Sequence, residues 1–523
     1  MAPSTSKHRP CIGINYRNFD QTVADWKDWI KLTDDLSDCD MDLDDEVCPY
    51  PQTAVPRIAL TEPAIHTDLT YQDIIVLEAE DQLNDLAMRE FVPQDCYDFT
   101  WTKDRNIFNG KRETFTGTPG PTVTVTDLTR ITDIFYKMID NDFVDTICIE
   151  TNRYADRKIK LLKDLGKFFP TSRLYRWTPT NRNEIYSFFA LIILQGLYPL
   201  PEEESYFSFN GFGTMPYFRR IMSYNRYLLL KSLMHFVDNN DLRENMTKLS
   251  KIQPVREYFN DKFSTLYYPS QEIVIDESLL KWHGRLGFAQ KIASKAAQVG
   301  VKTYELCDSS TGYLWKFFVS TGKDENKAVT TVIADDTNAD DLEGRPKKPE
   351  MTDQISDRPT NATSKIVYDL VEPLLHRGHT LIMDNFCNSP LLARYLKRQK
   401  TDCYGTLRLN REFVPDSLKT VTKTDIRQGE VVCSYTPDLS ICVWRDANLV
   451  SLISTYHHLQ IGNRQKYNRL TFKPSVVLDY NKSMGGVDRK DQYLSAQLLE
   501  RVKNKIWYNF SFAFLILLFS TVL

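Results

Sequence analysis

The stretch IVID at residues 273–276 decides the fold, because three apolar residues run directly into an aspartate. β-Branched residues favour extended backbone, so the stretch predicts a buried strand ending in the carboxylate of Asp276. The stretch LIM at residues 381–383 has the same form and ends in Asp384. A third aspartate, Asp488, follows Gly-Gly-Val at the start of a helical pattern. Two strand-end carboxylates and one helix carboxylate suit divalent metal ions that act on phosphates.

These carboxylates predict a site for Mg²⁺ or Mn²⁺, since Mg²⁺ prefers hard oxygen ligands. Asp491 lies three residues after Asp488 and shares its helix face, which makes it a second ligand or an orienting group. Glu277 follows Asp276 on the strand and is expected on the opposite face. Taken singly, each aspartate is equally well explained as a strand end or a helix cap. Their joint placement favours the metal site.

The elements between these acids alternate in a recognisable order. Strands are predicted at 272–275, 302–307, 313–320, 379–383 and 403–407, and helices at 366–375 and 390–399. The segment Asp308–Gly312 has hairpin-turn chemistry. The order of strand, hairpin pair, helix, strand, helix, strand and a last helix bearing Asp488 matches a ribonuclease-H-like domain. The predicted fold class is therefore mixed α/β.

The chain of 523 residues is too long for a single core, so about three domains are expected. Apolar residues at helical spacing fill the region before the first strand, and β-like segments interrupt the pattern after residue 408. The predicted parts are an acidic, largely disordered region at 1–104, a helical dimerisation and DNA-binding domain at 105–268, a ribonuclease-H-like catalytic domain at 269–408 and 475–497, a β-rich insertion at 409–474, and a C-terminal helix at 498–523 that returns to the helical domain.

The net charge of −4 hides an asymmetry along the chain. Residues 31–50 hold eight acids and one base, whereas residues 364–523 hold 22 Lys and Arg against 14 Asp and Glu. An acidic tail on a body that binds a polyanion would have this distribution. A solubilising tail on a mildly basic surface would have it too, so charge alone leaves both readings open.

The cysteines and the two ends of the chain indicate its cellular compartment and whether zinc or a membrane is involved. Ten cysteines are scattered without a Cys-x-x-Cys pair, so no zinc site is expected. The polar N-terminus has no signal-peptide apolar region, which predicts an intracellular protein with reduced thiols. Residues 506–523 carry no charge, and their length lies at the low edge for a membrane span. A buried helix is favoured there over a membrane anchor.

Several short motifs occur in a fixed order from about residue 115 to the end. They are FTGTPGP at 115–121, ETNRYA at 150–155, IDES at 275–278 followed by Gly-Arg at 284–285, MDNF at 383–386, GTLRLNR at 405–411 and YNKSMGGVD at 480–488. In these motifs the chain resembles the piggyBac family of DNA transposases and the cellular proteins derived from them. Each motif alone is weak, but their number and order make the resemblance specific.

The resemblance implies a nuclear, homodimeric enzyme that cuts double-stranded DNA at transposon ends. Carried over by position, the catalytic and metal-binding residues are Asp276, Asp384 and Asp488, with Asp491 as an associated acid. The family forms hairpin intermediates and joins ends into TTAA targets. Its attacking groups are water and DNA 3′-hydroxyls, so no protein nucleophile is needed.

Basic residues near the triad are expected to contact DNA phosphates. The predicted DNA-binding residues are Arg285, Lys295, Lys302, Arg408, Arg411 and Lys482, and Arg489 and Lys490 are further candidates. For each of them the ordinary alternative is a solvated surface charge.

The chain also departs from the family pattern. Ala289, Ala293, Ala296 and Gln298 stand where basic residues and prolines are usual, and residues 1–523 do not contain the cysteine-rich module that the resemblance leads one to expect. These differences motivate a second hypothesis: a domesticated, catalytically inactive protein derived from a transposase, which binds DNA or chromatin.

Overall fold

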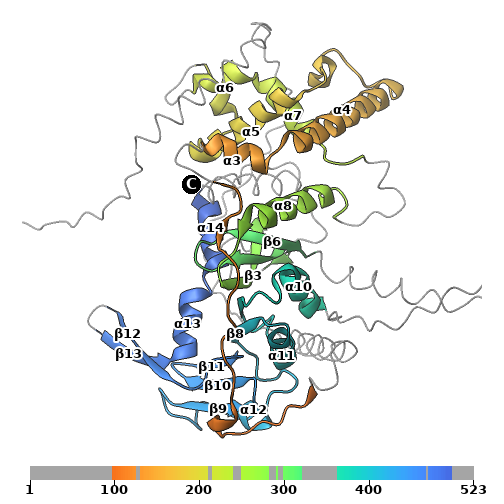
Figure 1. The fold of residues 1–523 in the computed structure, drawn as a ribbon. Helices are drawn as coiled ribbons and strands as arrows, with labels where there is room; N and C mark the ends of the chain where they lie inside the picture. The colour runs from red at the N-terminus through yellow and green to blue at the C-terminus, as the bar shows by residue number, and fades with distance from the viewer. Residues whose placement is uncertain are drawn as a thin grey trace, which may run out of the picture. The chain divides into compact units, whose positions relative to one another are not determined.

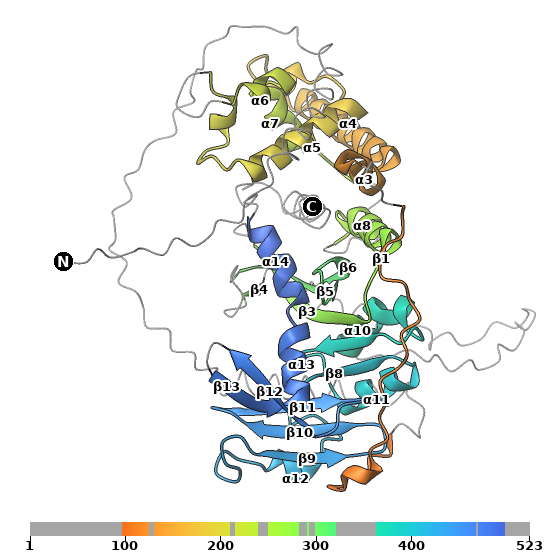
Figure 2. The same ribbon diagram turned by 60° about the vertical axis from the view of Figure 1, so that its left-hand side comes forward.

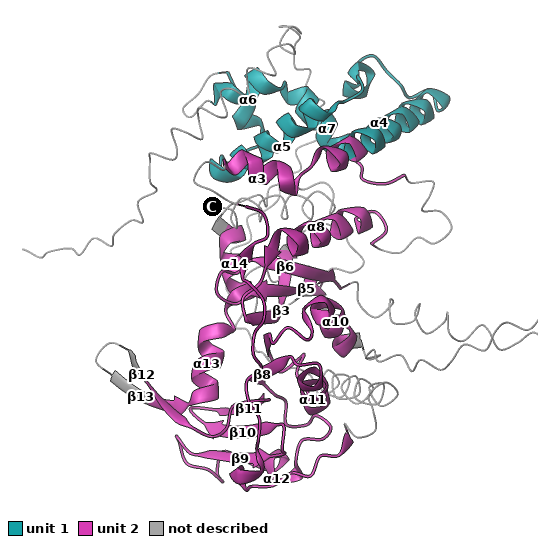
Figure 3. Ribbon diagram, viewed as in Figure 1, with its two compact units in different colours: residues 1–65, 147–234 teal, residues 66–146, 235–523 magenta. Residues whose placement is uncertain are grey.

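The computed structural model describes residues 97–124, 130–209, 215–238, 249–281, 290–291, 299–320, 362–466 and 469–496. They fall into two compact units (Figure 3). Within the described residues, unit 1 comprises 147–234 and unit 2 the remainder. The predictions for the acidic region up to residue 96 and for the C-terminal helix lie outside the described residues.

Unit 1 is helical. Its elements are the main part of α4 (Asn141–Asp164), η4 (Arg173–Arg176), α5 (Arg182–Leu197), η5 (Glu204–Phe207), α6 (Pro216–Ile221) and α7 (Tyr224–Leu233). The side chain of Asn181 caps α5 by accepting the N–H of Glu184, which satisfies one of the orphan donors at the start of the helix. Glu184 also pairs with Arg226 of α7 at 2.6 Å, so one carboxylate ties the first turn of α5 to a second helix.

Unit 2 is built on one large mixed sheet (Figure 1). Its strands are β3 (Glu272–Lys281), β4 (Gln290–Lys291), β5 (Val299–Asp308), β6 (Leu314–Val319), β7 (Thr380–Met383), β8 (Asp402–Thr406), β9 (Val431–Tyr435), β10 (Ser440–Arg445) and β11 (Leu449–Ser454). The order is β4-β5-β3-β7-β8-β11-β10-β9, and β6 pairs with the other side of β5. Strands β3, β7 and β8 run parallel, and the remaining pairs are antiparallel. The mixed α/β class predicted from the sequence is confirmed.

The predicted hairpin after the first strand is also present. The Asp308 carboxylate accepts the backbone N–H groups of Ser310 and Thr311, which closes the turn between β5 and β6. Gly312 follows with φ +77°, a left-handed conformation that favours glycine. The turn residues therefore form the hairpin for the local reasons that the sequence indicates.

Helices cover both faces of the sheet (Figure 2). Helix α14 (Gly486–Ala496) packs on β3 and β5, and α13 (Ser475–Ser483) packs on β8 and β11. On the other side, α10 (Ala362–Val371) lies beside β5 and β6 and is followed by η6 (Glu372–Leu374), and α11 (Pro390–Arg398) lies on β8. The core between these layers is apolar, and Ile275, Leu381 and Ile382 are fully buried. The sheet face under α13 and α14 is the one that carries the candidate site.

Residues 97–124 form an extended N-terminal arm that runs along unit 2. The arm contains η3 (Arg105–Ile107), Thr102 bridges Tyr435 of β9, and β1 (Gly120–Pro121) pairs with β2 (Tyr267–Tyr268). Residues 105–124 had been predicted in the helical domain. In the structure these residues belong to unit 2, because backbone groups of the arm pair with strands of that unit.

The helices α3 (Ile131–Met138) and α8 (Gln253–Leu266) also belong to unit 2 by their contacts. Helix α8 packs on β6, and the Asn260 side chain accepts the backbone N–H of Phe317 at 2.9 Å and donates to its carbonyl at 2.9 Å. An Asn that satisfies both backbone groups of one residue fixes the helix to the strand. The contact boundary of the helical unit thus lies inside the range predicted from the sequence.

The region 409–474 is rich in strands, together with the short helix α12 (Asp416–Lys419). Strands β9–β11 continue the main sheet, whereas β12 (Ile461–Lys466) and β13 (Arg469–Pro474) pair into a separate two-stranded ribbon.

Among the residues that the structure describes, no helix is long and apolar enough to cross a membrane.

Candidate functional site

Asp276 and Asp384 lie on neighbouring strands, but only Asp384 directly follows one. The predicted strand end at Asp276 is wrong, because residues 276–281 continue to pair with β5 and extend β3 to Lys281. In the parallel pairing of β3 and β7, Ile275 lies opposite Met383. Asp276 and Asp384 are the next residues, and paired strands lie about 4.8 Å apart. The backbone register therefore brings these two residues next to each other on adjacent strands, although 108 positions of sequence separate them.

Asp384 is held in a turn directly after β7. Its Oδ1 accepts the backbone N–H of Phe386 at 3.0 Å and that of Cys387 at 3.3 Å. Burial raises the pKa of the Asp384 carboxyl, and the nearby Glu277 carboxylate raises it further. The helix α11 has a different cap, Ser389, so capping that helix does not explain the aspartate.

Asp488 lies in the first turn of α14. The helix can begin there because Gly486 has no side chain. A Cβ at residue 486 would lie 3.0 Å from the carbonyl oxygen of Asp308, in the turn after β5. The Gly-Gly-Val sequence thus lets the start of the helix approach the sheet closely, and this places Asp488 beside the strand ends.

Tyr480 of α13 reports that the three aspartates converge. Burial raises the pKa of its phenol to about 12, and the negative charges of Asp276, Asp384 and Asp488 add to the rise. The Tyr480 hydroxyl therefore lies within electrostatic range of all three carboxylates. Tyr480 belongs to the YNKSMGGVD motif, but the sequence alone had no basis for assigning it to the site.

Side chains alternate between the two faces along β3, so the neighbouring acids Asp276 and Glu277 lie on opposite faces. Ser278 contacts α14 through Asp491, so Asp276, two residues earlier, lies on the same face of the strand. Glu277 lies on the opposite face and pairs with Lys302 at 2.7 Å. The expected separation of Asp276 from Glu277 is therefore present in the structure.

Asp491 is engaged in a buried polar network. Its Oδ1 accepts the Ser278 hydroxyl at 2.7 Å and lies 2.5 Å from the Lys490 ammonium. The same ammonium lies 2.5 Å from Glu305 of β5, and the Lys490 side chain is only 1% exposed. These contacts fix α14 on the sheet and hold Asp491 one helical turn from Asp488.

Of the two further phosphate-contact candidates, Lys490 is enclosed by the protein, whereas Arg489 is half-buried. Lys490 is buried in the network just described, and Arg489 donates to the backbone carbonyls of Ser309 and Ser310. Helical spacing could have indicated that Lys490 is buried, because it lies three residues after the buried Val487 and thus on the sheet-facing side of α14.

The other predicted DNA-binding residues lie in several environments. Lys482 is exposed near the end of α13, and Arg408 is half-buried with its Nε 3.4 Å from the Asn385 side chain. Lys302 is buried against Glu277, and the buried Arg411 donates to the Phe386 carbonyl at 2.7 Å. A phosphate could reach Lys302 or Arg411 only by replacing these internal contacts. The predicted residues Arg285 and Lys295 lie outside the described residues.

The donor chemistry of Asp276, Asp384 and Asp488 fits a magnesium-type ion, because all three offer carboxylate oxygens. Within the described part of the chain, no three His, Cys, Asp or Glu side chains are close enough together to form a complete metal site. The three acids thus share one corner without forming a closed cage. A hard cation that keeps several of its own waters is compatible with such an open set.

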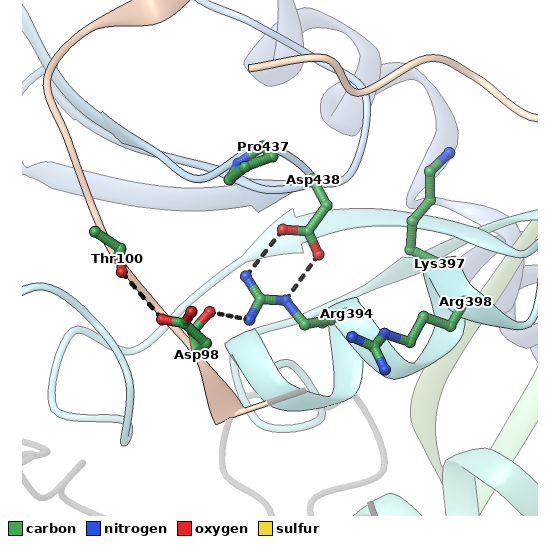
Figure 4. A pocket seen from close by; sticks show the side chains of 7 residues that line it. All are labelled: Asp98, Thr100, Arg394, Lys397, Arg398, Pro437 and Asp438. Carbon is green, nitrogen blue, oxygen red and sulfur yellow. Dashed lines mark hydrogen bonds and ion pairs between the residues drawn. The ribbon is translucent and has the colours of Figure 1, made fainter. Parts of the chain in front are cut away.

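A separate pocket of about 440 Å³ lies between the N-terminal arm, α11 and the turn after β9 (Figure 4). Its central cation, Arg394, makes a two-pronged ion pair with Asp438 at 2.8 and 2.9 Å and donates to the carbonyl of Asp98. The guanidinium also stacks over Phe99 at 3.9 Å. Arg394 is thus saturated by internal partners and fastens the arm to the sheet, which gives this pocket a structural explanation.

The chain is similar to several known proteins. A family model described as Transposase IS4 matches residues 132–521. Human PiggyBac transposable element-derived protein 2 is 23% identical over 390 residues, covering 72% of this chain and 58% of that protein. Human PiggyBac transposable element-derived protein 3 is 22% identical over 375 residues, covering 68% and 56%. The chain therefore spans little more than half the length of these relatives.

A solved structure shares the fold. The cryo-EM structure of a piggyBac transposase synaptic complex with hairpin DNA aligns with a TM-score of 0.59 and 21% identity, covering 78% of this chain and 76% of the other. At this identity the likeness concerns the fold.

Proposed function

The chain belongs to the piggyBac-type transposase family, and from this membership and its carboxylate corner we propose that it is a metal-dependent DNA strand-cleaving and strand-transferring enzyme. The substrate would be double-stranded DNA at transposon ends. The observation that carries the proposal is the register that puts Asp276 and Asp384 on adjacent strands, together with Asp488 in the first turn of the helix that packs on β3. We also propose that the protein acts in the nucleus as a homodimer, as the resemblance implies.

The strand arrangement supports a ribonuclease-H-like core. Strands β6, β5, β3, β7 and β8 are neighbours in that order, with the first three antiparallel and the last three parallel. In this topology the first and fourth strands of the core in chain order, β3 and β7, lie side by side. Asp276 of β3 and Asp384 after β7 are therefore neighbours, and α14, which packs on β3, would supply the third acid.

In this proposal Asp276, Asp384 and Asp488 would hold the metal ions. Bound divalent ions would stabilise charge on the attacking and leaving oxygens of the phosphodiester. The chain itself positions these acids: the turn N–H groups orient Asp384, and the buried Lys490 network holds α14 so that Asp488 stays at the corner. Because water or a DNA 3′-hydroxyl attacks, the protein needs no nucleophile of its own.

Cleavage of a short duplex with a TTAA flank in Mg²⁺ tests the proposal. The wild-type protein is expected to nick the DNA, and Asp276→Ala should abolish nicking because a metal ligand is lost. Asp446→Ala is the matched control, since Asp446 also follows a strand, β10, but at another edge of unit 2. Equal nicking by wild type and Asp276→Ala would refute the enzymatic proposal.

A second candidate is a DNA-binding protein that has lost catalysis. The open carboxylate set favours it, because no complete metal site is formed among the described residues. Calorimetric titration with Mg²⁺ or Mn²⁺ separates the two candidates. Heat that disappears in Asp276→Ala and persists in Asp446→Ala supports the enzyme, whereas salt-sensitive DNA binding without carboxylate-dependent heat supports the inactive protein.

A further inference from the structure

Two cysteines of the β-rich region face each other across a strand pair. In the antiparallel pairing of β9 and β10, Cys433 lies directly opposite Cys442. Ordinary cross-strand neighbours in such positions are the units through which a sheet is stabilised. Here both members are thiols, and the sequence pattern of scattered cysteines gave no indication of the pair.

The hydrogen-bond ladder shows which kind of pair this is. The backbone N–H of Arg445 bonds to the carbonyl of Glu430, and that of Thr436 bonds to the carbonyl of Leu439. Hydrogen-bonded and non-hydrogen-bonded pairs alternate along an antiparallel ladder. Counting inward from either end makes Cys433 and Cys442 a non-hydrogen-bonded pair, in which Cα atoms lie about 4.5 Å apart and side chains are closest. That separation falls within the range that a disulfide spans.

The two sulfurs already interact. The Cys442 thiol donates a hydrogen bond to the Cys433 sulfur, which lowers the pKa of Cys433 and raises that of Cys442. A sulfur with a lowered pKa supplies more thiolate, the nucleophilic form. The pair therefore contains one activated thiol and one thiol that can resolve its oxidised product.

Accessibility also distinguishes this pair. Cys433 is half-buried on β9, the edge strand of the main sheet, whereas Cys442 is buried. Cys307, Cys387 and Cys403 are buried as well, and burial raises the pKa of each. Among the cysteines that the structure describes, Cys433 is the one that combines partial exposure with an activating neighbour.

We propose that Cys433 and Cys442 are a redox modification site that a hydroperoxide converts to a cross-strand disulfide. The Cys433 thiolate attacks one peroxide oxygen, the O–O bond breaks, and the alcohol leaves after taking up a proton. The Cys442 sulfur then attacks the sulfenic acid of Cys433, the S–S bond forms, and water leaves with the Cys442 proton. Two thiols lose two electrons in all, and one hydroperoxide is reduced to an alcohol and water.

The crosslink would act on the edge of the sheet. Strand β9 also holds the N-terminal arm, because Thr102 and Tyr435 exchange two backbone hydrogen bonds at 2.9 and 2.7 Å. A covalent link from β9 to β10 limits local opening of this edge strand. Amide exchange at Tyr435 is therefore expected to slow on oxidation and to recover after reduction.

Peptide mapping of the full chain tests the site directly. Both cysteines lie in one tryptic peptide, residues 428–445, because Arg427 and Arg445 bound it. After hydrogen peroxide treatment this peptide should lose two hydrogen atoms and resist alkylation, and dithiothreitol should reverse both changes. Peptides that carry Cys307 or Cys403 are the internal controls and should remain fully alkylated.

Single variants identify the order of attack. Cys442→Ser should leave a sulfenic acid on Cys433 that dimedone traps, and Cys433→Ser should leave Cys442 reduced and open to alkylation after unfolding. If the wild-type peptide keeps both hydrogens at a peroxide dose that oxidises free cysteine, the proposal is wrong. Oxidation of Cys307 or Cys403 at the same rate would refute it equally. Neither result depends on DNA cleavage.

Discussion

Lys490 shows how much one side chain can determine at this site. Its ammonium lies between Glu305 and Asp491, and hardly any of the side chain is exposed. The partners raise its pKa although burial opposes the rise. A charge buried this deeply is tolerated only because both carboxylates and the Ser278 hydroxyl satisfy it.

We expect Lys490→Met to lower the free energy of unfolding by about 3–5 kcal/mol, because it leaves Glu305 without its countercharge. Urea denaturation measures the loss. Lys482→Met, an exposed lysine on the neighbouring helix, should change stability by less than about 0.5 kcal/mol. Adding Glu305→Gln to Lys490→Met should recover part of the loss. If the double variant is as unstable as the sum of the single variants, the ion pair does not explain the effect.

His379 makes stability depend on pH. Burial lowers its pKa to about 4 from an ordinary value of 6.5, while its Nδ1 lies 3.0 Å from the Ser270 carbonyl. Between about pH 4 and pH 6.5, His379 is therefore protonated in the unfolded chain and neutral in the folded chain. Stability is fully present above about pH 6.5 and falls as the pH drops toward 4, by about 3 kcal/mol in total.

Unfolding measured between pH 7 and pH 4.5 checks this expectation. His379→Asn keeps an amide near the position of Nδ1 but does not titrate, so its stability should fall less steeply than that of the wild type over this range. Parallel pH profiles for the two proteins would show that His379 is not the group responsible.

At the scale of secondary-structure elements, the pairing of β7 with β8 controls the position of Asp384. Gly405 of β8 lies opposite Met383, the residue before Asp384. A Cβ at residue 405 would overlap the carbonyl oxygen of Met383. Because the Met383 carbonyl oxygen is a backbone atom, the overlap can be relieved only if the end of β7 moves.

Gly405→Ala is therefore expected to lower stability by at least about 2 kcal/mol and to weaken Mn²⁺ binding by displacing the turn that holds Asp384. Gly485→Ala is the control, because a Cβ there would meet no heavy atom within 4 Å. Thermal unfolding and calorimetry measure the two effects. Unchanged stability and metal binding in Gly405→Ala would show that the strand end tolerates the shift.

At the scale of the whole molecule, the proposed DNA binding should depend strongly on salt. Each phosphate neutralised by a basic residue contributes about 0.9 to the slope of log K against log salt concentration. Lys482 and Arg408 flank the carboxylate corner. Lys419 of α12 is a matched distant control, since α12 packs on β9, four strands and about 19 Å from β7.

The double variant Lys482→Gln with Arg408→Gln should reduce the salt slope by about 1.8, whereas Lys419→Gln should leave it unchanged. Fluorescence anisotropy with a labelled duplex at several salt concentrations measures the slopes. If the double variant keeps the wild-type slope, DNA does not pass over this corner.

The order of elements followed from local pattern alone. Apolar runs such as residues 273–275 and 381–383 define strands wherever they are placed, and turn residues such as Asp308 and Gly312 act on their immediate neighbours. The position of Asp384 at a strand end was predictable for the same reason, but Asp276 lies within β3, which continues to Lys281 because residues 276–281 still pair with β5. The separation of Glu277 from Asp276 was also predictable, because side chains alternate along a strand.

Only the tertiary structure decided which side chains meet. Ser278 and Asp491 are 213 residues apart, so no local pattern could show that a hydroxyl would bind this carboxylate. The burial of Lys490, the course of the arm along unit 2 and the opposition of Cys433 to Cys442 are likewise products of packing and register. Periodicity sets the face on which a residue lies, but its partner comes from whichever distant segment the fold brings to that face.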